Sequence, residues 1–506
     1  MKTFKALPIA LFLLVPAAVS AEPAPAAAYK FLFAGNPAGT ATTRTVSDRE
    51  WIATFELNDR GRGPSTTTRW TLDGQGLPVR TEITGHDYWK TPVDERFERT
   101  AAKASWTNAS EREERTLDHP AFYTALNGPP QETEVLARAL LRAPEGRIAL
   151  LPTGEARIER VLSRQVTSGG ETRALDLYAI SGGGFTPGYF WLDDQKRLFA
   201  QIDGWATLVR EGWEGVTAEL LQAQEAKVAE REREQAQRLA RHPAAALAIR
   251  HARLFDPETG TVRPDTTVVI SGNRIAAVGR DGEVQVPQGA EGIDAGGKLL
   301  MPGLWDMHVH LVALDGILHL AAGVTSVRDL ANDTDQLLDL RRRFDAGETL
   351  GPRVLMAGFI DGPGPYAGPT KVLVDTPEEA LAAVDRYHEL GYVQIKMYSS
   401  LDPKLVPPII ERAHGYGMRR ELELYAKAGI PAPEILKIAT LGAARVMKRD
   451  GELGTIAPGK LADLILVDGD PTVRISDIQR VTLTIKDGVV YDPAALYATI
   501  GVKPAV

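Results

Sequence analysis

The chain has 506 residues, 44% of them apolar and 25% charged, an ordinary composition for a globular protein of two or three domains. Its formal net charge of −8 leaves no excess of basic residues and argues against nucleic acid as the main partner. There is no cysteine, so disulfides are excluded and any metal ion must be held by His, by carboxylates or by a modified side chain.

The first residues have the pattern of a signal peptide. Lys2 and Lys5 precede an apolar stretch at 6–15, and small residues follow at 18–21. A membrane anchor is the alternative, but the stretch is shorter than the roughly 18 apolar residues that a spanning helix needs, and no later segment approaches that length. We therefore expect residues 1–21 to be removed and the mature protein to be periplasmic or secreted, with no membrane span.

Residues 22–215 are expected to form an antiparallel β-rich domain. Polar and apolar residues alternate in TRWTLDGQGLPVRTEITG at 68–85, and DDQK at 193–196 lies between two apolar runs, as the turn of a hairpin does. One helix is predicted at 132–142.

Residues 216–243 are rich in Glu, Arg and Gln and have no strong apolar stripe. This pattern predicts a solvated helix that links two domains. A coiled-coil partner helix is the alternative, but the heptad positions are not consistently apolar.

Short strands with tight turns occupy 244–300, and the same texture returns at 452–495. We expect one small β-sandwich domain built from both flanks. Its predicted strands lie near 267–270, 275–278, 464–467 and 482–485.

Between these flanks, residues 301–451 alternate between strands and helices, which is typical of βα units around a parallel sheet or barrel. Thr376 is the predicted N-cap of one helix, with Glu379 completing a capping box. The strands are predicted at 323–330, 353–358 and 393–398, and the helices at 333–347, 376–391 and 405–417.

His308 and His310 are the first candidate metal ligands. Side chains two residues apart on a strand project to the same side, and the carboxyl end of a barrel strand is where barrel active sites lie. The spacing suits two ligands of one divalent ion, although such a pair on its own is also compatible with a purely structural role.

Two longer motifs give the pair its context. KLLMPGLWDMHVHL at 298–311 and TLGAARVMKRDGELGTIAPGKLADLILVDGDP at 440–471 closely resemble the amidohydrolase superfamily. The resemblance covers about 248–492 and not the N-terminal domain. It implies a metal-dependent (β/α) barrel, with zinc as the first candidate metal, in which His308 and His310 bind the metal.

The resemblance also implies a role for Lys396, in VQIKMY at 393–398. In similar proteins of the imidazolonepropionase-like and dipeptidase-like branch, a lysine at the end of the fourth strand is carbamylated and bridges two metal ions. The alternative is a lysine whose amine reaches solvent at the strand end. Asp306, two residues before the histidine pair, either orients a ligand as a partner behind it or is a solvated strand-end acid.

The family's pattern breaks after Lys396. Two further histidine ligands and a catalytic aspartate are required, yet of the nine histidines only His414 follows Lys396, within a predicted helix. Residues 301–447 are also too few for a barrel of about 250 residues. We therefore expect about four βα units to be missing near Arg419 and Arg420, through either a genomic deletion or an error in sequence assembly. No residue of this chain is assigned as the general base.

Two functions follow from these patterns. The first is an amidohydrolase-family, metal-dependent hydrolase of small-molecule amide or dipeptide C–N bonds, whose shortened chain is expected to show little or no turnover. The second is a non-catalytic exported binding protein whose function lies in the N-terminal β-domain. No pattern in the sequence specifies an oligomeric state.

Overall fold

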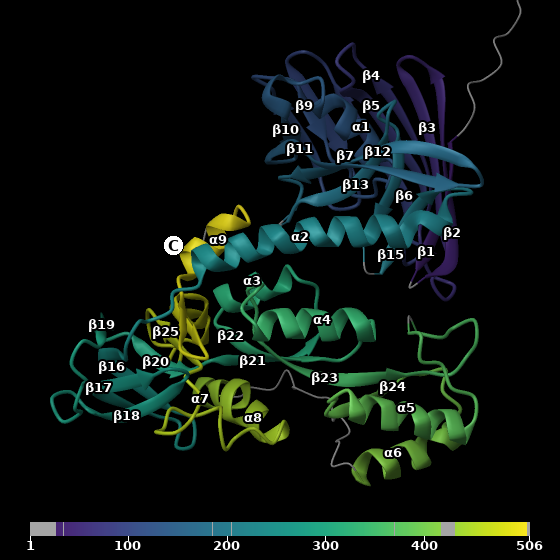
Figure 1. Ribbon diagram of the computed structural model, residues 1–506. Helices are drawn as coiled ribbons and strands as arrows, with labels where there is room; N and C mark the ends of the chain where they lie inside the picture. Colours follow the sequence, from purple (N-terminus) through teal and green to yellow (C-terminus); the bar gives the residue numbers. More distant parts are fainter. Residues whose placement is uncertain are drawn as a thin grey trace, which may run out of the picture.

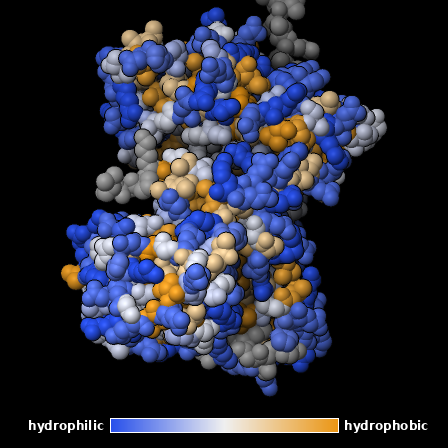
Figure 2. Space-filling model, turned by 60° about the vertical axis from the view of Figure 1, so that its left-hand side comes forward, coloured by the Kyte–Doolittle hydropathy of each residue, from blue (hydrophilic) through white to orange (hydrophobic). Residues whose placement is uncertain are grey.

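The computed structural model describes residues 27–33, 35–184, 186–203, 205–368, 370–415 and 431–502. The predicted signal peptide at 1–21 and the predicted junction at 419–420 lie outside this part of the chain. The described residues form an N-terminal lobe and a second lobe, with helix α2 (Thr217–Leu239) between them (Figure 1). Figure 2 shows the two lobes from another side, with apolar side chains interspersed among hydrophilic ones. Across the described residues, no helix is both long and apolar enough to cross a bilayer.

The N-terminal lobe is built on one fifteen-stranded sheet, in which all neighbours are antiparallel except the parallel pair β9 and β10. Strands β1 and β15 pair in its middle, so the two ends of the domain meet there. In chain order the strands are β1 (Ala27–Phe33), β2 (Asn36–Ser47), β3 (Glu50–Leu57), β4 (Ser65–Leu72), β5 (Pro78–His86), β6 (Pro92–Arg99), β7 (Lys103–Thr107), β8 (Arg112–Thr116), β9 (Ala121–Tyr123), β10 (Arg147–Leu151), β11 (Glu155–Ser168), β12 (Glu171–Ser181), β13 (Gly188–Asp193), β14 (Leu198–Ile202) and β15 (Ala206–Arg210).

Alternation along the strands fills the inside of this sheet. In β3, for example, Trp51, Ala53 and Phe55 are buried and the residues between them are more exposed. These side chains join a core that includes Leu140 of helix α1 (Glu132–Leu140). The interior of the sheet is thus occupied by α1 and by the protein's own side chains.

The pairing also fixes which turns face the second lobe. Because the strands alternate in direction, the β1–β2, β3–β4, β5–β6 and β14–β15 turns lie at one end of the sheet, and the β13–β14 turn lies at the other. The first end is directed toward the second lobe (Figure 1).

Helix α2 does more than the solvated linker predicted from its composition. Leu220 is buried in the N-terminal lobe and Ala236 in the second lobe. Glu232 pairs with Arg343 and accepts a hydrogen bond of 2.8 Å from the hydroxyl of Thr349. A cleft of about 870 Å³ runs along the helix between the lobes. The helix lies between the two lobes and most of its residues are not buried, but its few apolar positions are placed where both lobes can cover them.

An eight-stranded sheet joins the two flanks of the second lobe. The order is β18-β17-β16-β20-β25-β26-β27, with β19 paired to β16, so the expected strands of both flanks lie in one continuous sheet. Side chains of both flanks pack together in a single core. The strands are β16 (Leu247–Asp256), β17 (Thr261–Ser271), β18 (Arg274–Arg280), β19 (Glu291–Asp294), β20 (Leu299–Pro302), β25 (Leu464–Val467), β26 (Val481–Lys486) and β27 (Val489–Tyr491).

The β20–β25 pair is the junction between the flanks. All four residues of each strand are buried. Leu300 and Leu466 face one core, while Leu299 and Val467 face another on the opposite side. The sequence of a strand that is covered on both faces is a continuous run of apolar residues, as in β20 and β25. Met301 pairs with Ile465 in this sheet, so the barrel portion begins after Pro302 and not at residue 301.

The inserted part is a four-stranded parallel sheet in the chain order β21-β22-β23-β24. Over the described ranges no further strand extends it, and β24 does not pair with β21, so the barrel is not closed. Its elements are β21 (Leu304–Val309), α3 (Asp315–Ala321), β22 (Val324–Asp329), α4 (Thr334–Asp345), β23 (Arg353–Ile360), α5 (Pro377–Glu389), β24 (Gln394–Met397) and α6 (Val406–Gly415).

Local sequence explains these units. The predicted capping box of α5 is confirmed, since Glu379 N–H donates to the Thr376 hydroxyl at 3.3 Å and the Glu379 carboxylate accepts from Thr376 N–H at 3.2 Å. Strand β23 is buried over seven of its eight residues, as expected for a parallel strand covered on both faces.

The closing helices cover one face of the parallel sheet. Ala443, Ala444 and Met447 pack against Trp305 of β21 and Leu355 of β23. The helices that follow β24 and α6 are α7 (Ala432–Lys437), a π-helical turn (Ile438–Gly442), α8 (Ala443–Val446) and, at the end, α9 (Pro493–Thr499).

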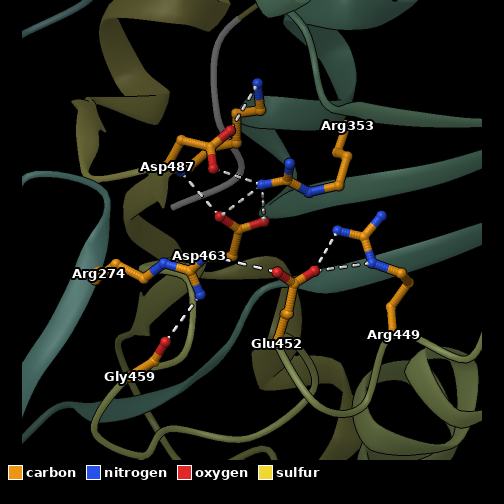
Figure 3. A network of polar contacts seen from close by, with 8 residues as sticks. Arg274, Arg353, Arg449, Glu452, Gly459, Asp463 and Asp487 are labelled. Atoms are coloured by element: carbon orange, nitrogen blue, oxygen red, sulfur yellow. Dashed lines mark hydrogen bonds and ion pairs between the residues drawn. The ribbon is translucent and has the colours of Figure 1, made fainter.

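A buried ion-pair network fastens the parallel sheet to the eight-stranded sheet (Figure 3). Arg353, at the start of β23, reaches Asp487 at 2.6 Å and Asp463 at 3.5 Å. The Asp463 side chain is 3% exposed, and its Oδ1 accepts from Asp487 N–H at 2.9 Å. Burial raises the pKa of Asp463, whereas Arg353 and Lys486 outweigh burial and lower the pKa of Asp487.

We predict that Arg353→Leu lowers the free energy of unfolding by about 3–5 kcal/mol, because it removes the cation that pairs with the buried Asp463 and leaves Lys486, 3.2 Å from Asp487, as the remaining cation of the pair. Urea unfolding followed by circular dichroism measures the change. Arg274→Ala is the matched control, since Arg274 pairs with Glu452 at 3.5 Å in the same region but both side chains are more than 40% exposed. The control is expected to cost less than about 1 kcal/mol. Equal losses in both variants would contradict the assigned role of Arg353.

A second prediction concerns pH and the first turn of α1. Burial raises the pKa of Glu132 to about 8, and Glu132 Oε2 has no hydrogen-bond partner among the described residues. In the folded state Glu132 therefore keeps its proton up to about pH 8, whereas in the unfolded chain it releases the proton near the ordinary pKa of a carboxyl group. The free energy of unfolding is therefore highest at acidic pH and falls as the pH rises toward 8. Glu132→Gln should be more stable than the parent at pH 8.5, by at least the roughly 1.4 kcal/mol of one pKa unit.

Urea unfolding at pH 5.5 and pH 8.5 tests this prediction. The parent should lose stability over this interval relative to Glu132→Gln. Parallel pH profiles for the two proteins would show that Glu132 is not protonated in the folded state.

Candidate active site

The predicted histidine pair lies at the carboxyl end of the first parallel strand. His308 is near the end of β21 and His310 is the first residue beyond it, and both side chains are exposed. Their ring centroids are 5.5 Å apart with an interplanar angle of 79°. The two imidazoles are therefore neighbours on one side of the strand, as the spacing of two residues predicted.

His310 is held in one orientation from behind. Its Nδ1 lies 2.8 Å from the carbonyl oxygen of Ala331, and because a carbonyl only accepts, Nδ1 carries the proton. Nε2 of the neutral ring then has a free lone pair. Partial burial, with the neighbouring Lys396 and His308, lowers the pKa of His310 and favours this neutral form. This is the state in which a histidine can bind a metal ion.

Asp329, at the end of β22, fixes the loops beside the histidines. Its carboxylate is fully buried and accepts from Leu311 N–H at 2.7 Å, Ala331 N–H at 3.1 Å and Asn332 Nδ2 at 3.2 Å. Burial raises its pKa to about 6, against the lowering effect of these donors. Asp329 therefore positions the segment that follows His310 and the carbonyl that holds the His310 ring.

Asp306 does not contact the imidazole of either candidate ligand. Its Oδ1 accepts from the backbone N–H of His308 at 3.1 Å, and its Oδ2 lies 3.6 Å from Nε2 of His319 on α3. These contacts outweigh burial and lower the pKa of Asp306. The Asp306 side chain is 45% exposed, and its contact with His319 joins β21 to α3.

Lys396 lies on β24 against two aromatic rings. Its Nζ is 5.6 Å from the ring centroid of Phe359 and 5.4 Å from that of Tyr398. Within the described part of the chain no carboxylate pairs with it. The Lys396 charge also acts on His310 and Asp329, which places these groups in one electrostatic neighbourhood. The structure thus places Lys396 and the histidine pair at the same end of the parallel sheet, where the carboxyl ends of β21 and β24 lie; this end is called the mouth below.

A buried arginine crosses the sheet below this mouth. Arg328 on β22 is 3% exposed, and its Nε donates to the carbonyl oxygen of Met307 at 2.8 Å. Its NH1 donates to Oε1 of Gln394 on β24 at 3.2 Å. These bonds link β21, β22 and β24 on the face that a closed barrel would enclose. They give the buried guanidinium of Arg328 the hydrogen-bond partners that a buried polar group needs.

The described residues do not complete a catalytic metal centre. They contain no group of three His, Asp or Glu side chains arranged to hold a metal ion. Catalytic zinc sites use three protein ligands and a water, so the histidine pair supplies two of the three. His319 and His388 lie on helices α3 and α5, and His414 lies on α6, away from the strand ends.

Sequence reasoning missed Asp329 and Arg328. Both belong to VRDL at 327–330, where two charged residues end an otherwise uncharged strand. A charged residue at the carboxyl end of a parallel strand is a signal for the mouth of a barrel. The signal was present, but only the structure shows which groups these side chains bind.

Residues 406–491 match the amidohydrolase family. Over 160 residues the chain is 32% identical to an adenine deaminase of Serratia proteamaculans, which covers 32% of this chain and 22% of that one. It is 40% identical over 77 residues to an imidazolonepropionase of Anaeromyxobacter dehalogenans, covering 14% of this chain and 18% of the relative. The second lobe is therefore similar to proteins of the amidohydrolase family. The chain matches about a fifth of the length of these curated relatives.

Among solved structures, the chain is similar to a prolidase of Bifidobacterium longum, with 21% identity and a TM-score of 0.45 over 51% of this chain and 99% of that one. A Xaa-Pro dipeptidase with bound methionine gives 19% identity and a TM-score of 0.41, over 49% and 100% of the two chains.

We predict that the chain binds zinc through His308 and His310, and that His308→Ala or His310→Ala weakens this binding at least tenfold because one of two imidazoles is lost. Competition with a chromophoric chelator measures the affinity. His251→Ala, which removes an exposed histidine of the eight-stranded sheet, is the control and should leave the affinity unchanged. Unchanged zinc affinity in both site variants would place the metal elsewhere.

Proposed function

We propose that the chain derives from metal-dependent hydrolases of C–N bonds in small amides, cyclic amides or dipeptides. We further propose that the shortened chain binds such molecules but has little or no turnover. The relatives named above act on C–N bonds, which supports the reaction class. The exported, periplasmic or secreted location inferred from residues 1–21 is part of this proposal.

One observation carries the proposal. The mouth has two neighbouring histidines, one of them oriented for metal binding, but the described residues do not supply the further ligands of a catalytic metal centre. His310 has its Nδ1 bonded to Ala331 and its Nε2 free. In a longer form of the chain, His308, His310 and carbamylated Lys396 would hold zinc, which would supply activated water. The described residues alone leave that centre incomplete.

No described carboxylate at the mouth is free to act as the general base. Asp329 has the right place at a strand end, but both of its oxygens accept hydrogen bonds from the adjacent loops. Asp306 is engaged by His308 N–H and by His319. A general base must reach the proton that it removes, so these contacts favour retention of binding over retention of catalysis.

The alternative, a non-catalytic exported binding protein with its function in the N-terminal β-domain, is less well supported. A ligand inside the large sheet would need an internal space, whereas α1 and the aromatic core occupy the interior. The end of the sheet that faces the second lobe is the part of this domain that comes close to the candidate site.

The test is an assay of the purified full chain with added zinc on N-acyl amino acids and dipeptides. We expect a rate within tenfold of zinc alone, for the parent and for His308→Ala alike. Robust turnover that disappears in His308→Ala, while His251→Ala keeps it, would contradict the proposed loss of activity. Re-sequencing the gene across codons 418–421 shows whether the deletion is genuine.

A further inference from the structure

A pocket of about 290 Å³ lies at the end of the fifteen-stranded sheet that points away from the second lobe (Figure 1). The β2–β3 turn, the β4–β5 turn and the last turns of α1 bound it. Because neighbouring strands are antiparallel, these two turns lie opposite to the β1–β2 and β3–β4 turns, which face the second lobe. Three arginines line the pocket: Arg49 comes from the β2–β3 turn, Arg138 from α1, and Arg142 from the residues just after this helix.

Two of these arginines have no counter-charge. Arg49 and Arg142 are exposed, and neither forms an ion pair with a carboxylate of the residues that the structure describes. Arg142 crosses the β4–β5 turn at Gly76, where a Cβ would lie 2.5 Å from NH1 of the arginine. The Arg142 guanidinium can therefore occupy this place only because residue 76 has no side chain.

Arg138 lies over the ring of Trp51, with its Cζ 5.1 Å from the ring centroid. Its NH1 is 3.9 Å from Glu134. Burial raises the pKa of Glu134 to about 7, so this carboxyl group is only partly ionised at neutral pH. Burial, together with the charges of Arg142 and Arg197, lowers the pKa of Arg138 against the opposing effect of Glu134. Negative charge is thus scarce around Arg138 as well.

The acidic residues of the pocket do not balance the arginines. Asp73 already pairs with Arg99 at 2.6 Å, and its other oxygen accepts hydrogen bonds from two backbone N–H groups of its own turn, at 2.9 and 3.0 Å. Asp48 is the remaining carboxylate of the lining. Three guanidinium groups therefore share one cavity with a single carboxylate that is not already paired.

The helix alone does not explain this cluster. The C-terminal end of a helix is negative and favours nearby cations, which suits Arg138 and Arg142. Arg49 comes to the same cavity from a separate turn, and its charge adds to the repulsion between the other two. A cleft lined by charges of one sign concentrates the opposite charge, so the pocket is suited to an anion.

We propose that this pocket binds a phosphate group, which belongs either to a soluble phosphate ester or to an anionic lipid headgroup. Guanidinium groups match phosphate oxygens with paired N–H donors. A phosphate dianion offers oxygens to donors from three side chains, whereas a carboxylate has only two oxygens. The site lies at the rim of the N-terminal lobe, and it depends on neither a metal ion nor the function proposed for the second lobe.

Isothermal titration calorimetry of the full chain tests this inference, with phenyl phosphate and benzoate as probes at pH 8 in phosphate-free buffer with EDTA. The phosphate is a dianion at this pH, because its second pKa is about 6. The parent should bind phenyl phosphate more tightly than benzoate, by about tenfold or more. Arg49→Ala and Arg142→Ala should each weaken phenyl phosphate binding by about tenfold, because one of three guanidinium groups is lost. Both side chains are exposed, so these variants are expected to fold, which circular dichroism verifies.

Arg115→Ala is the matched control. Arg115 also lies over a tryptophan, 5.2 Å from the ring centroid of Trp106, but it is on β8 and outside the pocket. This variant should keep the parent's affinity for phenyl phosphate. A parent that binds phenyl phosphate no more tightly than benzoate, or a folded Arg142→Ala variant with the parent's affinity, would overturn the inference.

Flotation with phosphatidylcholine vesicles, with and without phosphatidic acid, distinguishes the two sources of the phosphate group. Capture by the vesicles that contain phosphatidic acid, lost in Arg142→Ala and kept in Arg115→Ala, would support a lipid headgroup. Phenyl phosphate binding without capture by either kind of vesicle would support a soluble phosphate ester.

Discussion

The pairing of β20 with β25 is the constraint on which the second lobe depends. These strands come from opposite sides of the inserted βα units, and their four residue pairs close one sheet across the insert. Because both faces of the pair are buried, its hydrogen bonds lie in an apolar environment where breaking them is expensive. The two ends of the half barrel are held together whatever the number of units between them.

This arrangement explains how four βα units persist without the rest of a barrel. Arg353 fastens the start of β23 to Asp463 and Asp487, which adjoin β25 and β26. The closing helices cover Trp305 and Leu355 on one face, and Arg328 joins Met307 and Gln394 across the strands. The candidate metal site is incomplete, because the ligands that such a fold would take from later strands are not among the described residues. The histidine pair and Lys396 remain together.

The sequence predicted those features that depend on local patterns. The capping box of Thr376, the alternation of strands and helices, and the side-by-side histidines follow from periodicity and from the chemistry of short motifs. The assembly of the two flanks at 244–300 and 452–495 was expected from their matching short strands, but other contacts between distant segments were not predicted. The burial of Leu220 and Ala236 on α2 needs two separate lobes to cover a helix that is polar in composition. Arg60, in the β3–β4 turn, approaches the ring of Tyr398, just beyond β24, and this contact depends on the direction of fifteen strands and on the seating of one lobe against the other. The contact of Asp306 with His319 was not predicted either, because a strand pattern gives the side of a side chain but not its partner.

Amide hydrogen exchange in increasing urea tests the central claim most directly. If the β20–β25 pair holds the second lobe together, the amides of residues 299–302 and 464–467 should exchange only by global unfolding, with the largest protection in that lobe. The amides of β24, at the open edge of the parallel sheet, should exchange through a smaller, local opening. Protection in β20 and β25 that is no greater than in β24 would contradict this account.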